Sequence, residues 1–245
     1  MKINFKTALI KMYVISIFSL SITSLFAQNP VLKIEKINPK LYVHTTYNVF
    51  NGQQYSANGL YLITKKGVVI FDTPWDQTQY QPLLDSIKNK HHLPVIAIFA
   101  SHWHEDRAGG FAYYNKIGVP TYATAQTNTI LKANNKASST KEIVLGKTYR
   151  IGGEKFKIEY FGEGHSLDNT VVWFPKYQVL NGGCLIKSAE ATNLGFVGDG
   201  NVAAWPATIQ KLEHAHPVIK KVISGHDNWK LDGHLERTKE LLNQK

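Results

Sequence analysis

The residues best suited to chemistry in this chain lie in the stretch SHWHEDRAGG, residues 101–110. His102, His104 and Asp106 stand at alternate positions there, and Arg107 follows them. In an extended segment, residues two apart point to the same side, so both imidazoles could reach one ion. On a helix, a metal-binding pair of histidines would instead be spaced four apart. The spacing therefore predicts a metal site carried by an extended segment.

Three more segments bring a metal-binding side chain to the end of a strand-like run. KFKIEYF leads to His165 through GEGH, YQVLN leads to Cys184 through GGC, and KKVIS leads to His226 through GH. Sites in layered α/β proteins gather at strand ends. We therefore expect these three segments and the stretch at 101–110 to meet in one cleft.

Two ion sites can be assembled from these side chains. A set of three histidines with an open fourth position is the pattern of catalytic zinc, and here it would consist of His102, His104 and His165. Asp106, Cys184 and His226 could hold a second ion nearby. Taken alone, Cys184 fits a buried structural thiol equally well. The remaining histidines are expected to be ordinary surface or core residues: His44, His91, His92, His214, His216 and His234.

The elements that must position these side chains alternate between strands and helices. Strand-like runs include residues 32–37, 41–47, 58–64, 67–72 and 95–100 in the first half, and 142–146, 155–161, 169–174, 177–181 and 220–224 in the second. Helical patterns cover about 76–90, 111–115, 129–132, 207–214 and 235–242. This order predicts an α/β protein in which two mixed sheets lie face to face with helices outside, a four-layer αβ/βα sandwich. Its two similar halves would span about 28–140 and 141–245 of a single domain, 28–245.

Residues 1–27 have the pattern of a secretory signal peptide. Lys2, Lys6 and Lys11 precede a short apolar run from Met12 to Ile22, and small residues lead to a cut after Ala27. We therefore expect export to the periplasm, and no stable association with a membrane.

The chain has 245 residues and a formal net charge of +10, which becomes 10 − 3 = +7 without the three signal lysines. A basic chain can bind nucleic acid. Here, however, the lysines are scattered and no arginine-rich or aromatic-basic run appears. We therefore expect no nucleic-acid partner. Nothing in the sequence requires a protein partner either, and we expect a monomer.

HWHED, followed later by GHS, GGC and GHD, resembles the metallo-β-lactamases, specifically subclass B1 and its flavobacterial chromosomal enzymes. The resemblance extends from the N-terminal hairpin through FDTPW at 71–75 to GHDNW at 225–229. It implies the metallo-β-lactamase fold and two Zn²⁺ ions, the first on the three histidines and the second on Asp106, Cys184 and His226. It also implies hydrolysis of the β-lactam amide of penicillins, cephalosporins and carbapenems, which confers antibiotic resistance.

The same resemblance assigns roles to individual residues. Asp106 would orient a zinc-bound hydroxide, so no covalent intermediate is expected. Lys187 would meet the substrate carboxylate, and Asp72 would brace the metal-binding loop. Residues 47–54 correspond to a mobile hairpin over the substrate, with apolar walls from Val49, Phe50 and Trp75.

One position separates this chain from thioester hydrolases and nucleases of the same fold, and another departs from the common metallo-β-lactamase pattern. Where thioester hydrolases of the glyoxalase II type and RNA-processing relatives have a second-site histidine after the aspartate, this chain has Arg107, and Cys184 restores the lost ligand. Where many metallo-β-lactamases have an asparagine twelve residues after the cysteine, this chain has Phe196. Phe196 is therefore expected near the substrate, but without the amide donor.

Three other functions remain open. A glyoxalase II-like thioester hydrolase, or a phosphodiester hydrolase, on the same fold is the main alternative. A nonenzymatic zinc-binding protein is disfavoured by the open three-histidine site, and only net charge suggests a nucleic-acid binder.

Overall fold

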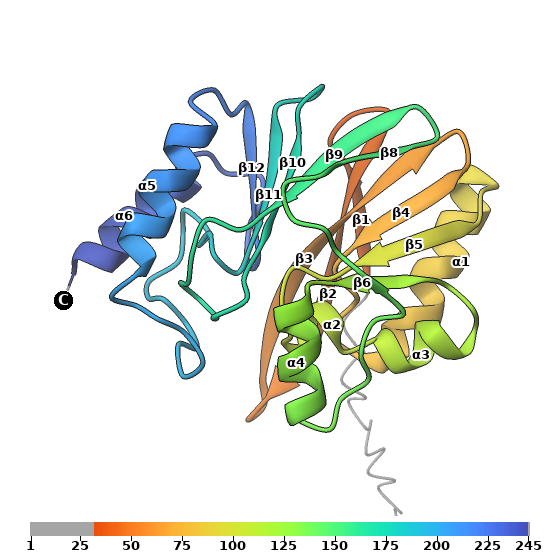
Figure 1. Cartoon of the computed structure of the whole chain (residues 1–245), viewed down its shortest axis with the longest axis horizontal. Coiled ribbons are helices and arrows are strands. Elements are labelled where there is room, and N and C mark those ends of the chain that lie inside the picture. Colours follow the sequence, from red (N-terminus) through yellow and green to blue (C-terminus); the bar gives the residue numbers. More distant parts are fainter. Residues whose placement is uncertain (1–31, 245) are drawn as a thin grey trace, which may run out of the picture.

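The computed structural model describes residues 32–244, so the expected signal peptide at 1–27 lies outside the described residues. Two mixed sheets face one another, and helices cover their outer sides (Figure 1). The predicted four-layer αβ/βα sandwich is confirmed. No helix within residues 32–244 combines the length and the apolar character needed to cross a bilayer.

The first sheet has seven strands in the order β1-β2-β3-β4-β5-β6-β7. Strands β1 to β4 pair antiparallel, whereas β4 to β7 pair parallel. The bounds are β1 (Lys33–Lys36), β2 (Leu41–Phe50), β3 (Gln53–Thr64), β4 (Gly67–Phe71), β5 (Val95–Phe99), β6 (Thr121–Ala123) and β7 (Lys141–Glu142).

The second sheet has five strands in the order β12-β11-β10-β9-β8, with only the β11–β12 pair parallel. The bounds are β8 (Thr148–Ile151), β9 (Glu154–Glu159), β10 (Val171–Phe174), β11 (Val179–Gly183) and β12 (Lys221–Ser224). Because β4 and β5 are parallel, Asp72 and His102 follow their ends at the same edge of the first sheet, and Cys184 follows the end of β11 in the second sheet.

Six α-helices are described, and one of them, α4, begins at a side-chain cap. They are α1 (Tyr80–His91, preceded by the short 3₁₀ helix η1, Gln77–Gln79), α2 (Glu105–Ala108), α3 (Phe111–Lys116), α4 (Ala125–Ala133), α5 (Trp205–Ala215) and α6 (His234–Asn243). Thr124 caps α4 by accepting a hydrogen bond from the Thr127 amide at 3.0 Å. The helices α5 and α6 flank the five-stranded sheet, and α1 and α3 cover the seven-stranded sheet (Figure 1).

The main core lies between the sheets and is apolar on both sides. Phe71 and Phe99 of the first sheet meet Phe156 of the second, with Phe71 and Phe156 rings 4.9 Å apart edge to face. Each buried aromatic ring of this kind contributes on the order of 2–3 kcal/mol through apolar burial. The core fixes the two sheets against each other, and with them the strand ends that carry the ligands.

One predicted strand is wrong. Residues 142–146 were expected to form a strand, but only Glu142 belongs to one, in β7. Val144 and Leu145 are exposed, and Gly146 turns the chain with a φ of 74°. The strand is β8, just beyond this turn, which pairs with β9 through Gly152 and Gly153. Hydrophobicity alone did not distinguish an exposed apolar turn from a strand.

His44 is buried in the fold, and its charge state couples folding to pH. Its ring lies over Gly59, where a Cβ would come within 2.4 Å of the ring, so only glycine fits there. Burial lowers the pKa of His44 to about 3 from its ordinary 6.5. As the pH falls, the unfolded chain therefore binds a proton at His44 before the folded chain does. The free energy of unfolding decreases for this reason as the pH falls below about 6.5.

Replacing His44 with leucine is expected to reduce acid sensitivity. At about pH 4.5 the wild-type penalty from this one group amounts to roughly 3 kcal/mol, and the variant lacks it. The measurement is the free energy of unfolding in urea at neutral and acidic pH, in metal-free protein. His214→Gln, which changes an exposed histidine, serves as the control. Equal acid sensitivity in His44→Leu and wild type would contradict the assignment.

Candidate metal centre

The structure brings His102, His104 and His165 together. His102 and His104 lie in the bend at 101–104 that joins β5 to α2, with extended backbone at His104 (φ −64°, ψ 159°), and His165 lies in the middle of the loop between β9 and β10. The Nδ1 atom of His104 lies 3.1 Å from His102 Nε2 and 3.1 Å from His165 Nε2. The alternate spacing does place both imidazoles on one side, and the third histidine comes from 61 residues further along the chain.

Hydrogen-bond partners decide which nitrogen of each ring is free. His104 Nε2 lies 3.0 Å from a carboxylate oxygen of Asp199, which can only accept, so the proton of His104 is on Nε2. In the neutral ring, His104 Nδ1 then carries a lone pair that faces the Nε2 atoms of His102 and His165. Burial lowers the pKa of His102 and of His165 well below the ordinary value, so both rings are neutral. Three imidazole nitrogens that converge on one point fit a cation such as Zn²⁺.

Asp106, Cys184 and His226 form a second group beside the first. Cys184 Sγ lies 3.1 Å from His226 Nε2 and 3.4 Å from Asp106 Oδ2, and His226 Nε2 is 3.3 Å from the same carboxylate oxygen. Potential ligand atoms of His102, Asp106 and Cys184 all lie within 4.8 Å of one another. The two groups are therefore neighbours, and a thiol, a carboxylate and an imidazole make a donor set that fits zinc.

The electrostatics of the second group reflect its concentrated charge. Burial disfavours the charged form of His226, but the Cys184 sulfur and the Asp106 carboxylate outweigh it and raise the pKa of His226 to about 10. Burial likewise opposes ionisation of Asp106, yet Arg107 and His226 hold the pKa of that carboxyl well below its ordinary value. Both shifts favour the charged forms of His226 and Asp106, because each is stabilised by an oppositely charged neighbour.

Arg107 ties the ligand segments together. It is fully buried, and its guanidinium donates to the carbonyls of Asn58 at 2.7 Å and Gly225 at 2.8 Å. It also donates to Cys184 Sγ at 3.0 Å and to Asp72 at 3.3 Å. Its Nε lies 2.9 Å from the Asp106 carboxylate, an ion pair without a well-aligned hydrogen bond.

Asp72 reaches the ligand-bearing loop from the end of β4. Its carboxylate accepts a hydrogen bond from the Ser101 amide at 2.7 Å, one residue before His102. Its own φ is 67°, in the left-handed region that aspartate adopts more readily than most residues other than glycine. The surrounding hydrogen bonds hold Asp72 in this conformation, where it can brace the 101–106 segment.

The predicted substrate-contacting residues surround the two ligand groups. Phe50, on the hairpin of β2 and β3, lies 5.3 Å from the Trp75 ring, which lies 5.5 Å from the His226 ring. Phe196 is 62% exposed, and its ring is 5.8 Å from that of His104. Val49 is exposed on the same hairpin as Phe50.

Lys187 follows β11 and the Cys184 turn. Its Nζ lies 5.3 Å from the centre of the Trp205 ring, and burial lowers the pKa of its ammonium. A Cβ on Gly195 would come within 3.8 Å of Nζ, so the loop that carries Phe196 passes directly beside the ammonium. Lys187 is itself buried, at 8% exposure, and lies under the loop that carries the exposed Phe196.

Asp199 is a site residue that sequence reasoning missed. It sits between Gly198 and Gly200, and a Cβ on Gly200 would collide with the carbonyl of Gly164 at 2.5 Å. The Asn201 amide donates to that same carbonyl at 2.8 Å, which holds the loop against the His165 segment. The only sequence signal was an aspartate between two glycines, and it did not indicate which histidine the carboxylate would meet.

Asp199→Ala is expected to weaken Zn²⁺ binding at the three-histidine group about 10- to 100-fold, because His104 loses the partner that sets its tautomer and orientation. The measurement is a Zn²⁺ titration in competition with a chromophoric chelator. Asp232→Ala, which removes an almost fully exposed carboxylate, is the matched control. An unchanged dissociation constant for the tighter-binding ion would refute the role of Asp199.

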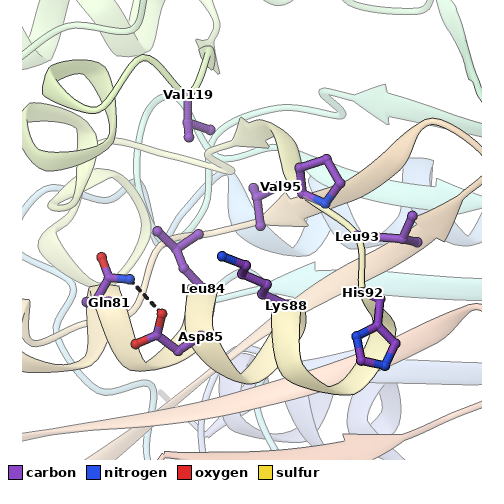
Figure 2. A pocket seen from close by; sticks show the side chains of 9 residues that line it. Gln81, Leu84, Asp85, Lys88, His92, Leu93, Val95 and Val119 are labelled. Atoms are coloured by element: carbon purple, nitrogen blue, oxygen red, sulfur yellow. Dashed lines mark hydrogen bonds between the residues drawn. The ribbon is translucent and has the colours of Figure 1, made fainter.

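A surface hollow of about 540 Å³ lies elsewhere on the molecule. It is bordered by α1, the segment 92–95 and Val119, and Figure 2 shows Gln81 donating to Asp85 at its edge. Val95 is at the beginning of β5, whereas the histidine segment follows its end. The hollow is therefore at the opposite end of β5 from the ligand groups, and none of its lining residues is a predicted site residue.

Comparison with known proteins agrees with this geometry. The family model described as the metallo-beta-lactamase superfamily matches residues 56–226. The chain is 51% identical over 236 residues to metallo-beta-lactamase IND-1 of Chryseobacterium indologenes, covering 96% of this chain and 98% of that protein. It is 40% identical to metallo-beta-lactamase type 2 of Elizabethkingia meningoseptica, covering 93% of each. The crystal structure of metallo-beta-lactamase IND-7 matches with a TM-score of 0.85 and 54% identity, covering 87% of this chain and 98% of that one.

Proposed function

The chain belongs to the metallo-beta-lactamase superfamily, and from this premise we propose that it hydrolyses the amide bond of β-lactam antibiotics with the help of zinc. The observation that carries the proposal is the meeting of two ligand groups, His102–His104–His165 and Asp106–Cys184–His226, around neighbouring points. Such hydrolysis would confer antibiotic resistance. The resemblance to subclass B1 of the family agrees with the 51% identity to IND-1.

We propose that each group holds one Zn²⁺ ion, two per chain. Bound there, zinc would act as a Lewis acid on the lactam carbonyl and would lower the pKa of water toward neutrality. The carboxylate of Asp106 lies at the junction of the two groups, where it can accept a proton or a hydrogen bond from the attacking water. The buried arginine beside it keeps Asp106 ionised for this task.

The substrate would be held by one ion pair and by two groups of aromatic rings. The Lys187 ammonium would pair with the substrate carboxylate. Phe196, beside His104, and Trp75 with Phe50, beside His226, would form apolar walls at opposite ends of the ligand cluster. The side chain of Phe196 has no N–H or O–H to donate to the lactam carbonyl, so this chain would polarise that carbonyl without the side-chain amide that many relatives use.

A thioester hydrolase of the glyoxalase II type is the alternative that the same fold allows. Arg107 disfavours a thioester hydrolase. Its guanidinium occupies the place of a second-site histidine and donates a hydrogen bond to the Cys184 sulfur. The curated relatives named here are all called metallo-beta-lactamases. β-Lactam hydrolysis is therefore the better supported activity.

The proposal is tested by supplying the zinc-loaded protein with imipenem, aztreonam and S-lactoylglutathione in parallel. Family resemblance implies rapid hydrolysis of imipenem, a carbapenem, and sparing of aztreonam, with no thioester cleavage. Benzylpenicillin and a cephalosporin extend the test to the other two classes. Cleavage of the thioester in preference to all β-lactams would overturn the proposal.

Lys187→Ala is expected to raise KM for imipenem about 10- to 100-fold while kcat changes little, because a charged contact present in both ground and transition states is lost. Steady-state kinetics provide the measurement. Lys176→Ala, which removes an exposed ammonium, is the control for loss of overall positive charge. An unaltered KM would remove Lys187 from the binding site.

We also propose that the protein acts in the periplasm. The support is the signal-like pattern at residues 1–27 together with the nature of the substrate, since β-lactams reach their targets outside the cytoplasm. Detection of the mature protein in a periplasmic fraction, with an N-terminus at residue 28, would test this.

A further inference from the structure

Three Asn-Gly pairs occur in the chain, and they lie in very different surroundings. Asn51–Gly52 forms the tip of the β2–β3 hairpin, and both residues are exposed. Asn58–Gly59 lies inside β3 and Asn181–Gly182 inside β11, and both of these pairs are buried. The three pairs have the same two residues, but only Asn51–Gly52 is exposed to solvent.

We propose that Asn51 is a site of spontaneous deamidation that slowly alters the hairpin over the metal centre. The backbone nitrogen of Gly52, losing its proton to hydroxide, attacks Cγ of Asn51. A new C–N bond forms, the Cγ–Nδ2 bond breaks, and ammonia leaves. Water then opens the resulting succinimide at either carbonyl, which yields aspartate or isoaspartate. The net change is the addition of water and the loss of ammonia, with no oxidant or reductant.

The hairpin tip allows the motion that this reaction requires. Asn51 and Gly52 have φ values of 50° and 76°, which is the two-residue turn that Asn-Gly favours. The backbone must leave this turn before the nitrogen can reach Cγ. No atom lies within 4 Å of the position where Gly52 would carry a Cβ, so Gly52 itself packs against nothing. Loop tips of this kind open at little free-energy cost.

The two buried pairs cannot open in the same way. The Asn58 side chain donates to the carbonyls of Ser224 at 3.1 Å and Asp227 at 3.0 Å, and its oxygen accepts from Thr45 at 2.8 Å. Asn181 lies at 1% exposure in β11, between β10 and β12. Opening either site would break paired strands of the sandwich, so both amides are protected while the protein is folded.

The consequence for function rests on the proposed function. Phe50, next to Asn51, packs against Trp75, and Trp75 packs against His226. Aromatic contacts therefore connect the hairpin tip to the metal centre. Deamidation adds a negative charge to this hairpin. Because β-lactam substrates carry a carboxylate that Lys187 would attract, the new charge is expected to repel them. Isoaspartate also lengthens the backbone by one carbon and distorts the turn.

The experiment incubates the zinc-loaded, full mature protein at mildly alkaline pH and 37 °C for several days, followed by peptide mapping by mass spectrometry. We expect the mass gain of amide-to-acid conversion, with isoaspartate, at Asn51 and not at Asn58 or Asn181, with fragment ions separating Asn51 from Asn58 within residues 41–65. Gly52→Ala, which hinders the attacking nitrogen, should slow the conversion at least several-fold. Equal conversion at all three pairs, or none at Asn51, would overturn the proposal.

The functional consequence is measured separately with Asn51→Asp. We expect KM for imipenem to rise about two- to threefold at low ionic strength and to return toward wild type at high salt, as screening requires. Asn135→Asp, which places the same charge on another exposed left-handed turn residue, is the control. An unchanged KM would remove the effect on the substrate. The mass measurement stands independently of β-lactam hydrolysis, so failure of the proposed function would be recognised by wild type leaving imipenem intact.

Discussion

Removal of divalent metal by a chelator is expected to lower imipenem hydrolysis at least about a thousandfold, because polarisation of the carbonyl and activation of water are together worth several kcal/mol. Addition of Zn²⁺ should restore the rate. The physical basis is that no other group at the junction of the two ligand sets can take over both tasks. Of the described residues there, Asp106 is an acceptor and Arg107 is fully engaged with the protein.

The scaffold is expected to survive chelation, and this separates the loss of chemistry from the loss of fold. The inter-sheet core contains none of the ligands. The far-ultraviolet circular dichroism spectrum should therefore remain that of the folded protein after metal removal. Hydrolysis at the original rate in verified metal-free protein would defeat the metal mechanism.

Cys184→Ser should leave one ion bound to the three histidines, and retention of both ions at full affinity would refute the second ligand set.

Arg107→Leu is expected to destabilise the protein by about 3–5 kcal/mol, the usual result of leaving buried charge without its partner. The substitution strands the carboxylates of Asp72 and Asp106 and two buried carbonyls. Because Arg107 joins the segments of Asn58, Cys184 and Gly225, its loss should also lower affinity for metal at the Asp106–Cys184–His226 group. Urea unfolding of the metal-free protein measures the first effect, and Zn²⁺ titration the second.

A matched control for Arg107 is available in the same chain. Arg237 bonds to Glu240 and to the Ala191 carbonyl at the surface, so Arg237→Leu should cost no more than about 1 kcal/mol. Combining Arg107→Leu with Asp72→Asn should recover part of the loss, because one stranded charge is removed. A stability of Arg107→Leu equal to that of Arg237→Leu would show that the guanidinium does not hold the ligand segments together.

The layers and the ligand segments of this protein could be predicted because they depend on local patterns. Short runs of β-branched and aromatic residues marked most strands, and the His102–His104 spacing correctly placed both rings on one side of their segment. Where the local pattern was ambiguous, the prediction was wrong, as at Val144 and Leu145, which lie exposed in a turn before β8. An apolar run contains no information about whether a partner strand exists to cover it.

Long-range relationships were not predictable in this way. Asp199 reaches His104 across 95 residues, and the sequence offered only a glycine-flanked aspartate. His44, expected to be an ordinary histidine, is buried over Gly59, and its pKa is lowered to about 3. Both facts depend on neighbours that sheet pairing and loop packing bring together.

The sequence by itself determined which donor atoms this protein can offer a metal, and that they follow strands, because side-chain chemistry and the period of an extended chain are local properties. Only the tertiary structure decided which donors meet, which ring nitrogens stay free of protons, and which of three identical Asn-Gly pairs faces water. These outcomes arise from packing between distant segments, where burial and a few hydrogen bonds shift the free energy of each group far from its value in an isolated chain.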